Sequence, residues 1–118
     1  PVQGGELEGR LASRILPNSF SIVDDPTQKS YKGRPLMGYY PVDQEGVLPK
    51  PVVLVEKGAW AGYLATRQPT RENKESNGHA RLKGNFGANL AFMSNLFVKS
   101  TDGVSNEELR KQFLDLLK

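Results

Sequence analysis

The stretch PVVLVEKGAWAGYLATR constrains the fold more than any other part of the sequence. Residues 51–56 are rich in β-branched residues, and residues 59–66 form a second apolar and aromatic run. Two such runs on either side of a Lys57-Gly58 turn are typical of a β-hairpin. Apolar residues at both odd and even positions of the first run indicate that both of its faces are covered. We therefore expect an antiparallel hairpin with strands at 51–56 and 59–66.

Two further strands are expected outside this hairpin. In NSFSIVDDPT, Phe20 and Ile22 recur with the period of two that a half-covered strand shows. The residues Asp24-Asp25-Pro26 end that strand, because proline disfavours the helical region for the residue before it and aspartates favour turns. A late apolar run, ANLAFMSNLFVK, predicts another strand near 88–99.

Two helices are expected at the ends of the chain. Leu7, Leu11 and Ile15 recur at i, i+4 and i+8, which predicts a short helix over 5–16. Ser105 and Glu108 form a capping box that begins a C-terminal helix. The apolar face of that helix carries Leu109, Phe113, Leu116 and Leu117. The expected class is therefore α+β, with a mainly antiparallel sheet, a short N-terminal helix and an amphipathic C-terminal helix.

Two long segments have few apolar residues. Residues 28–49 are rich in Gly and Pro, which predicts a winding loop with a short strand in LMGYYPVD and a turn at DQEG. Residues 67–87 form a polar loop of a length that is usually functional or disordered. For Asp24 and Asp25 before Pro26, the preferred interpretation is turn capping, and the alternative is that one of them orients a neighbouring segment. For Asp43 and Glu45 in DQEG, the preferred interpretation is a role in the turn and exposure to solvent.

Composition limits the class of protein. The 118 residues fit one domain spanning 1–118, and no apolar run approaches the length of a membrane span. The net charge of +3 comes from basic residues that are scattered along the chain and not gathered on one stretch with aromatics, which argues against nucleic-acid binding. The absence of cysteine fits a reducing cytoplasm. Because the chain starts at Pro1 and stops at the end of a helix, we expect it to be a piece of a longer polypeptide.

The motif ESNGHAR, inside the polar loop, contains the only histidine. Asn77-Gly78 is a turn dipeptide, and in an extended chain His79 and Arg81 face the same side. Arg81 could bind a carboxylate and His79 a peptide amide, so Asn77, His79 and Arg81 are the candidate substrate-binding residues. The alternative is a solvent loop in which the histidine has no role.

The aromatic residues offer a second candidate surface. Trp60 and Tyr63 near the hairpin turn, and the pair Tyr39-Tyr40, could line a binding surface. Packing within the sheet is the preferred interpretation, because aromatic side chains at strand positions usually contact neighbouring strands.

The sequence does not contain a self-contained catalytic set. One histidine without cysteine cannot supply the usual three protein ligands of a catalytic zinc ion. There is no G-x-S-x-G nucleophile motif and no glycine-rich phosphate loop between a strand and a helix. We therefore expect no catalytic residue and no metal ligand in this chain.

Five segments in order carry a resemblance to a known family: GELEGRLASRILPNSFSIVDDPT, GRPLMGYYPVDQEGV, VVLVEKGAWAGYLATR, SNGHARL and SNLFVKSTDGVSNEELRKQFLDLLK. Together they resemble the TldD/PmbA family, whose members are cytoplasmic zinc-dependent peptidases and their companions, historically called modulators of DNA gyrase. Their most specific parts are VDDPT, D-x-E-G and S-N-G-H-x-R. The resemblance covers nearly the whole chain.

The resemblance implies a role for this piece of the parent protein. In the family, zinc is held by an H-E-x-x-x-H helix upstream of the matched region and by a cysteine downstream, and neither occurs here. A C-terminal-domain fragment would then provide scaffold and walls of a cleft for extended peptides, with zinc expected in the parent if it has the H-E-x-x-x-H motif. The family forms homodimers and heterodimers. The alternatives are a non-enzymatic dimerisation domain of a zinc-lacking member and a nucleic-acid-associated modulator of DNA gyrase.

Overall fold

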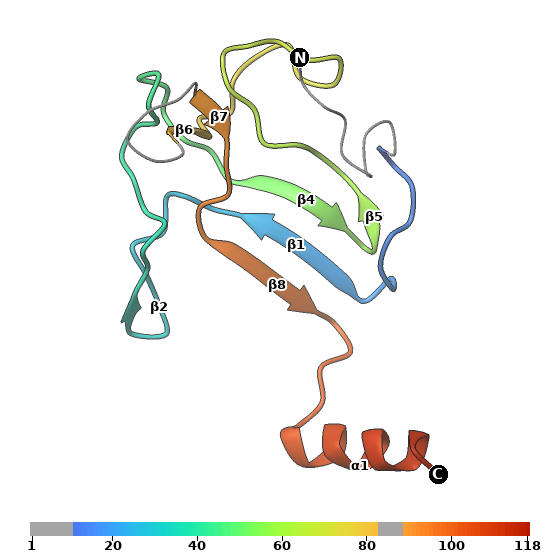
Figure 1. Cartoon of the computed structure of the whole chain (residues 1–118). Coiled ribbons are helices and arrows are strands. Elements are labelled where there is room, and N and C mark those ends of the chain that lie inside the picture. Colours follow the sequence, from blue (N-terminus) through green and yellow to red (C-terminus); the bar gives the residue numbers. More distant parts are fainter. Residues whose placement is uncertain (1–10, 83–88) are drawn as a thin grey trace.

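A four-stranded antiparallel sheet forms the centre of the fold (Figure 1). The computed structural model describes residues 11–82 and 89–118. The strand order is β5-β4-β1-β8, and the strands are β1 (Phe20–Asp24), β4 (Val52–Glu56), β5 (Ala59–Trp60) and β8 (Leu96–Ser100). Two small hairpins are added, β2 (Ser30–Tyr31) with β3 (Arg34–Pro35) and β6 (Ala80–Leu82) with β7 (Asn89–Ala91). With the single described helix α1 (Asn106–Leu116), this arrangement confirms the α+β class and its mainly antiparallel sheet.

The predicted hairpin turn at Lys57-Gly58 is confirmed. Lys57 has φ 48° and Gly58 has φ 81°, so both central residues have the positive φ of the turn type whose twist matches paired strands. A side chain at Gly58 would meet the carbonyl oxygen of Leu16 at 2.2 Å, which makes glycine necessary there. The turn therefore fixes β4 against β5 and against the chain entering β1.

The return strand is shorter than the expected 59–66. β5 ends at Trp60, although the Ala61 N–H still donates to the Leu54 carbonyl at 2.7 Å. Farther on, the Tyr63 carbonyl accepts hydrogen bonds from the side chains of Asn73 and Asn77. Because side chains of the following loop satisfy this backbone, residues 61–66 do not pair as a strand.

The strand expected near 88–99 is divided in two. Residue 88 lies outside the described residues, and the chain leaves the β7 pairing before Ser94 and Asn95. The Ser94 backbone N–H and hydroxyl donate to the carboxylate of Asp24, and the Asn95 amide donates to the Asp25 carbonyl. These contacts interrupt the run, which then resumes as β8 along the edge of β1.

Two other expectations are corrected. Of the short helix expected over 5–16, residues 5–10 lie outside the described residues, and residues 11–16 form a turn and a bridge between Arg14 and Ala59. Ala12 has φ 69°, which a right-handed helix excludes. The strand expected in LMGYYPVD is absent; the segment turns, and the hairpin β2–β3 precedes it.

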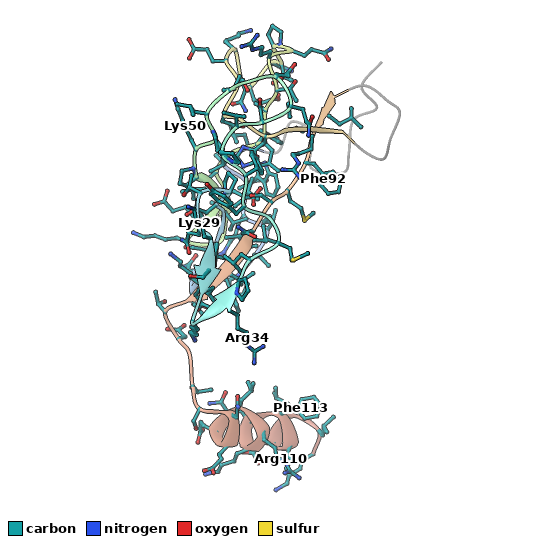
Figure 2. The ribbon with its side chains drawn as sticks, turned by 90° about the vertical axis from the view of Figure 1, so that its left-hand side faces the viewer. Lys29, Arg34, Lys50, Phe92, Arg110 and Phe113 are labelled. Atoms are coloured by element: carbon teal, nitrogen blue, oxygen red, sulfur yellow. The ribbon has the colours of Figure 1, made fainter. Side chains whose placement is uncertain are left out.

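The C-terminal helix is confirmed, and its apolar face is exposed. The Ser105 hydroxyl accepts from the Glu108 N–H at 3.2 Å, as the capping box predicts. In Figures 1 and 2, α1 stands away from the sheet, and every residue of the helix is exposed, Leu109 to 57% and Phe113 to 59%. The described parts of the chain therefore leave this face without a packing partner. No helix within them has the length and apolar character needed to span a bilayer.

The interior is small and contains many polar side chains. The buried apolar residues are Tyr40, Val55, Ala65 and Ala80, and the buried polar or charged residues are Asp24, Asp25, Asp43, His79 and Asn95. Buried polar groups are stable only when they are hydrogen-bonded, so these side chains are expected to organise the loops around the sheet.

Asp25 shows how one buried carboxylate organises a turn. Burial acts to raise the pKa of Asp25, but hydrogen bonds from the Thr27 hydroxyl, the Thr27 N–H and the Gln28 amide together hold it below the ordinary value. The charge of nearby Lys99 adds to this lowering. The predicted turn-capping role of Asp25 is therefore confirmed.

Candidate functional site

The ESNGHAR motif enters the interior of the fold at Gly78. Gly78 has φ 78°, and a side chain on it would meet the Cα atom of Pro49 at 2.5 Å and the Leu48 carbonyl oxygen at 2.6 Å. The Asn77 carbonyl accepts from the Lys50 N–H at 3.2 Å. The chain after Gly78 is thus pressed against residues 48–50 before it forms β6.

His79 is fully buried and not part of a solvent loop. Its ring Nδ1 lies 3.1 Å from both the backbone carbonyl oxygen and the side-chain Oδ1 of Asn77. Its Nε2 lies 3.4 Å from Oδ2 of Asp24, and both side chains are 0% exposed. Nε2 makes no hydrogen bond, so this contact is a close approach of a ring nitrogen to a carboxylate.

The Asn77 side chain binds the backbone of the segment after β5. Its Oδ1 accepts from the Ala65 N–H at 2.7 Å, and its Nδ2 donates to the Tyr63 carbonyl at 2.9 Å. The His79 N–H donates to the Ala65 carbonyl at 3.3 Å, and the His79 carbonyl accepts from the Phe92 N–H at 3.0 Å. Asn77 therefore joins the segment after β5 to the start of β6.

Asp43 and Tyr40 hold the same segment from the other side. Oδ1 of Asp43 closes the DQEG turn by accepting from the Glu45 and Val47 N–H groups, and Oδ2 accepts from the Ala80 N–H at 3.2 Å. The Tyr40 hydroxyl donates to the Gly78 carbonyl at 2.6 Å. Asp43 is in a turn, as expected, but it is buried and not a solvent residue.

The pKa of Tyr40 reflects both its burial and the charges around this segment. Burial raises the pKa of Tyr40 to about 12; the charge of Arg81 opposes this rise, and the carboxylates of Asp24 and Asp43 add to it.

We call the set Asp24, Tyr40, Asp43, Asn77 and His79 the polar junction. It connects β1, the DQEG turn, the segment after β5 and β6.

Arg81 lies beside the polar junction, on β6. Its guanidinium carbon lies 4.4 Å from the centre of the Tyr40 ring, a distance typical of a cation–π contact. Its side chain is half-buried, and no carboxylate within residues 11–82 and 89–118 forms an ion pair with it. A guanidinium that is supported on one face by an aromatic ring and has no carboxylate partner can bind an incoming carboxylate in bidentate fashion.

The three sequence-predicted residues therefore lie together but in different environments. Asn77 is half-buried and holds backbone, His79 has no exposed surface, and Arg81 is half-buried with its guanidinium on the Tyr40 ring. Sequence reasoning missed Asp24, Tyr40 and Asp43 as their partners. The available signal was that Asp24 and Asp43 lie in VDDPT and D-x-E-G, two of the three most specific short motifs.

The four aromatic side chains of the second candidate surface mainly pack within the fold. Trp60 and Tyr63 lie edge to face, with ring centres 5.5 Å apart, and Tyr40 is buried. Of these four side chains only Tyr39 is exposed, and the Lys29 ammonium lies 5.1 Å from the centre of its ring. The packing interpretation is thus confirmed for three of the four rings.

The residues present do not fit a metal centre. Among the described residues, no group of three His, Asp or Glu side chains is arranged to hold an ion. The one histidine has Nδ1 in contact with two amide oxygens, and its whole ring is buried, so neither ring nitrogen is accessible to a metal. No catalytic step can be assigned to a metal held by these residues.

A family model and two curated proteins with similar sequences match most of this chain. A family model described as the PmbA/TldA metallopeptidase C-terminal domain matches residues 5–117. A protein named metalloprotease from Archaeoglobus fulgidus is 32% identical over 109 residues, which are 92% of this chain and 24% of that protein. A metalloprotease from Methanothermobacter thermautotrophicus is 34% identical over 105 residues, 87% of this chain and 21% of that protein.

A solved structure shares the fold. The crystal structure of TldE from Thermococcus kodakarensis aligns with a TM-score of 0.64 at 22% identity, covering 88% of this chain and 22% of that one. The chain thus spans less than a quarter of the length of these relatives.

Proposed function

The chain belongs to the PmbA/TldA metallopeptidase family, as its C-terminal domain, and we propose that it forms a wall of the peptide-binding cleft in a cytoplasmic parent enzyme. In this proposal the parent hydrolyses extended or unfolded peptides with zinc held by residues outside this chain. The domain itself supplies scaffold and a substrate contact. The names of the curated relatives, which describe metalloproteases, support the reaction class.

The observation that carries the proposal is the environment of Arg81. Its guanidinium rests on the Tyr40 ring and forms no ion pair among the described side chains. An extended peptide presents carboxylates at its C-terminus and on acidic side chains, and a bidentate arginine is the side chain best suited to bind them. Arg81 is therefore the proposed contact with a peptide carboxylate.

Asn77 and His79 belong to the same proposed binding segment in a different role. Because the His79 ring has no exposed surface, it does not reach a peptide in the conformation described. Both residues instead hold the backbone from which Arg81 projects, through the hydrogen bonds of the polar junction. The substrate contact of this segment is thus direct at Arg81 and indirect at the other two positions.

The test compares Arg81→Ala and Arg81→Lys in the full-length parent. Matched peptides would carry either a free C-terminal carboxylate or a C-terminal amide, with kcat and KM measured for each. We expect Arg81→Ala to raise KM about tenfold or more for the free acid and to leave the amide nearly unchanged, since charge-assisted hydrogen bonds contribute about 1.5–3 kcal/mol. Arg81→Lys should recover part of the loss. Equal effects on both peptides would contradict the proposal.

A second candidate function is assembly with another subunit, and the exposed face of α1 favours it. Leu109 and Phe113 are more than half exposed on a helix that stands away from the sheet. Apolar surfaces of this kind often mark protein interfaces. Replacing both residues with glutamate in the parent and measuring its oligomeric state by sedimentation would test this function: loss of a dimer supports it, and an unchanged state contradicts it.

A further inference from the structure

The outer edge of β8 has no partner strand. β8 is the last strand of the central sheet, and within the described part of the chain it pairs only with β1 (Figure 1). We propose that this edge binds an extended segment of a partner protein as an added antiparallel strand, and that the segment alternates apolar and acidic residues. The site is separate from the Arg81 contact and does not rest on the proposed function.

The pairing of β8 with β1 determines which backbone groups face outward. At one end of the pairing, the Asp25 N–H donates to the Asn95 carbonyl at 2.9 Å. At the other end, the Thr101 N–H donates to the Ser19 carbonyl at 3.0 Å. Hydrogen-bonded pairs alternate with non-bonded pairs along an antiparallel ladder, so the odd-numbered residues of β8 direct their N–H and C=O groups at β1. The even-numbered residues direct theirs away from the sheet: Leu96, Val98 and Ser100.

These outward backbone groups are available to another chain. Within residues 11–82 and 89–118, the N–H and C=O groups of the three even-numbered residues make no hydrogen bond. An exposed strand edge is a template for a further strand, and a peptide that adds to it gains main-chain hydrogen bonds. A row of unpaired N–H and C=O groups therefore favours a polypeptide as the ligand over a nucleic acid, which has no matching main-chain groups.

One face of β8 requires apolar residues in the added strand. Leu96 and Val98 lie on the same face, because side chains alternate along a strand. Leu96 is 47% exposed and Val98 is 60% exposed. A residue of the added strand that lies opposite Val98 directs its side chain to this same face. An apolar side chain there removes its own surface and that of Val98 from water.

The opposite face of β8 is basic. Lys99 is exposed on that face, and Phe97 beside it contacts Tyr31 edge to face, with ring centres 5.4 Å apart. This contact brings the hairpin β2–β3 to the same face. Lys32, in the turn of that hairpin, has its ammonium 5.3 Å from the centre of the Tyr31 ring. Figure 2 shows Arg34 pointing from the hairpin toward the side on which α1 lies.

This basic surface has few acidic neighbours. No Asp or Glu occurs between Asp25 and Asp43, whereas that stretch contains three basic residues. Neither these three nor Lys99 forms an ion pair with a described carboxylate, although the charge of Lys99 acts on Asp25 from a distance. Acidic side chains on the added strand therefore meet cations that lack an ion-pair partner, and their charge also steers the segment toward this edge.

The two faces together determine which edge of the segment pairs with β8. An apolar residue opposite Val98 forms a hydrogen-bonded pair with it, because the backbone groups of Val98 face outward. The N–H groups of the apolar residues therefore point at β8, and the N–H groups of the acidic residues point away from it. An antiparallel segment that satisfies the side-chain pattern must use this edge.

Binding of a synthetic peptide to the full-length parent tests the site. The probe is a fluorescently labelled eight-residue peptide in which valine and glutamate alternate, and fluorescence anisotropy at low salt measures its Kd. N-methylation of the valines removes the N–H groups that point at β8 and should weaken binding about tenfold or more, whereas N-methylation of the glutamates should leave it nearly unchanged. Equal effects of the two modifications, or no binding of the unmodified probe, would overturn the proposal.

Variants of the parent test the residues of the site. Val98→Pro removes a donor that faces outward and keeps the pairing of β8 with β1, and it should weaken binding about tenfold or more. Lys99→Glu should weaken binding about threefold or more. Lys111→Glu makes the same charge change on α1, away from the sheet, and should have little effect. Equal losses from the two lysine changes would refute the basic face of the site.

Hydrogen exchange at single-residue resolution tests whether the edge is open in the parent. We expect the Val98 amide to exchange quickly in the free parent and to be protected when the probe binds. The Lys99 amide, which faces β1, should be protected in both states. A Val98 amide that is protected without the probe would overturn the proposal, because a strand of the parent or of a second copy would then already cover the edge.

Discussion

Replacing Gly78 with alanine should separate the ESNGHAR segment from the chain that supports it. Gly78 has φ 78°, and an added Cβ would lie 2.5 Å from Pro49 Cα, 2.6 Å from the Leu48 carbonyl oxygen and 2.8 Å from Pro49 N. All three contacts are with backbone, so no side chain can rotate away to relieve them. Residues 77–79 or residues 48–50 must therefore shift.

The expected loss in the free energy of unfolding for Gly78→Ala has two parts. A left-handed backbone conformation costs a residue with a side chain about 1–2 kcal/mol relative to glycine. Forcing extra atoms into a packed site adds about 1–3 kcal/mol. Gly78→Ala should thus lower the free energy of unfolding by about 2–5 kcal/mol in total. The backbone shift at residue 78 should also weaken the hydrogen bond from the Tyr40 hydroxyl to the carbonyl of residue 78.

Gly46→Ala is a matched control for the first part. Gly46 has φ 75°, and an added Cβ there would meet no atom within 4 Å. It should therefore lose only the conformational part, about 1–2 kcal/mol. Urea unfolding of both variants in the same parent measures the difference, which is the steric part alone. If Gly78→Ala destabilises the protein no more than Gly46→Ala does, the close packing of residues 48–50 against the motif is refuted.

Three further outcomes are expected. Val55 is 1% exposed on β4, between β1 and β5, and Val55→Ala should lower the free energy of unfolding in urea by about 2 kcal/mol. Val53→Ala, at a 44% exposed site of the same strand, should lower it markedly less. Equal losses would contradict the assignment of the core. Because the pKa of Tyr40 is raised from 10.0 to about 12, its neutral form stabilises the fold, and this contribution is complete below pH 10.0 and lost as the pH rises toward about 12; Tyr40→Phe should remove that part of the alkaline dependence, and an unchanged profile would contradict it. Ser105→Ala should reduce the helicity of α1, measured by circular dichroism, through loss of about 1 kcal/mol of capping, and Ser105→Asp should retain it; no difference between the two would contradict the cap.

The parts of the fold that depend on nearby residues could be predicted from the sequence. The hairpin followed from a Lys57-Gly58 pair between two β-rich runs, and α1 followed from a capping box and a 3.6-residue period. These signals lie within a few residues of the structure that they determine. The strand at Phe20–Asp24 was likewise visible in its alternation.

The parts that depend on distant residues could not be predicted. The run near 88–99 reads as one strand, but Ser94 binds the carboxylate of Asp24, a partner 70 positions away, and the strand is interrupted there. The return strand after Trp60 ends because the side-chain amides of Asn73 and Asn77 both donate to the Tyr63 carbonyl. Periodicity carries no information on such side-chain to backbone bonds.

The candidate site shows the same division. The motif could be selected because it contains the lone histidine and a basic residue beside a turn, yet nothing local indicated that His79 is buried. Its burial follows from contact with Asp24, 55 residues earlier by sequence number, and from the backbone around Ala65. The carboxylates of VDDPT and DQEG were assigned mainly to turns, whereas Asp24 and Asp43 hold the segment before Arg81 from two sides.

The most direct test of the proposed peptide contact is a crystal structure of the full-length parent with a non-hydrolysable peptide that ends in a free carboxylate. We expect a carboxylate of the peptide to lie about 2.7–2.9 Å from the guanidinium nitrogens of Arg81, with the guanidinium still resting on the Tyr40 ring. A bound peptide with no carboxylate near Arg81, or an Arg81 paired instead with an acidic side chain of the parent, would contradict the assignment.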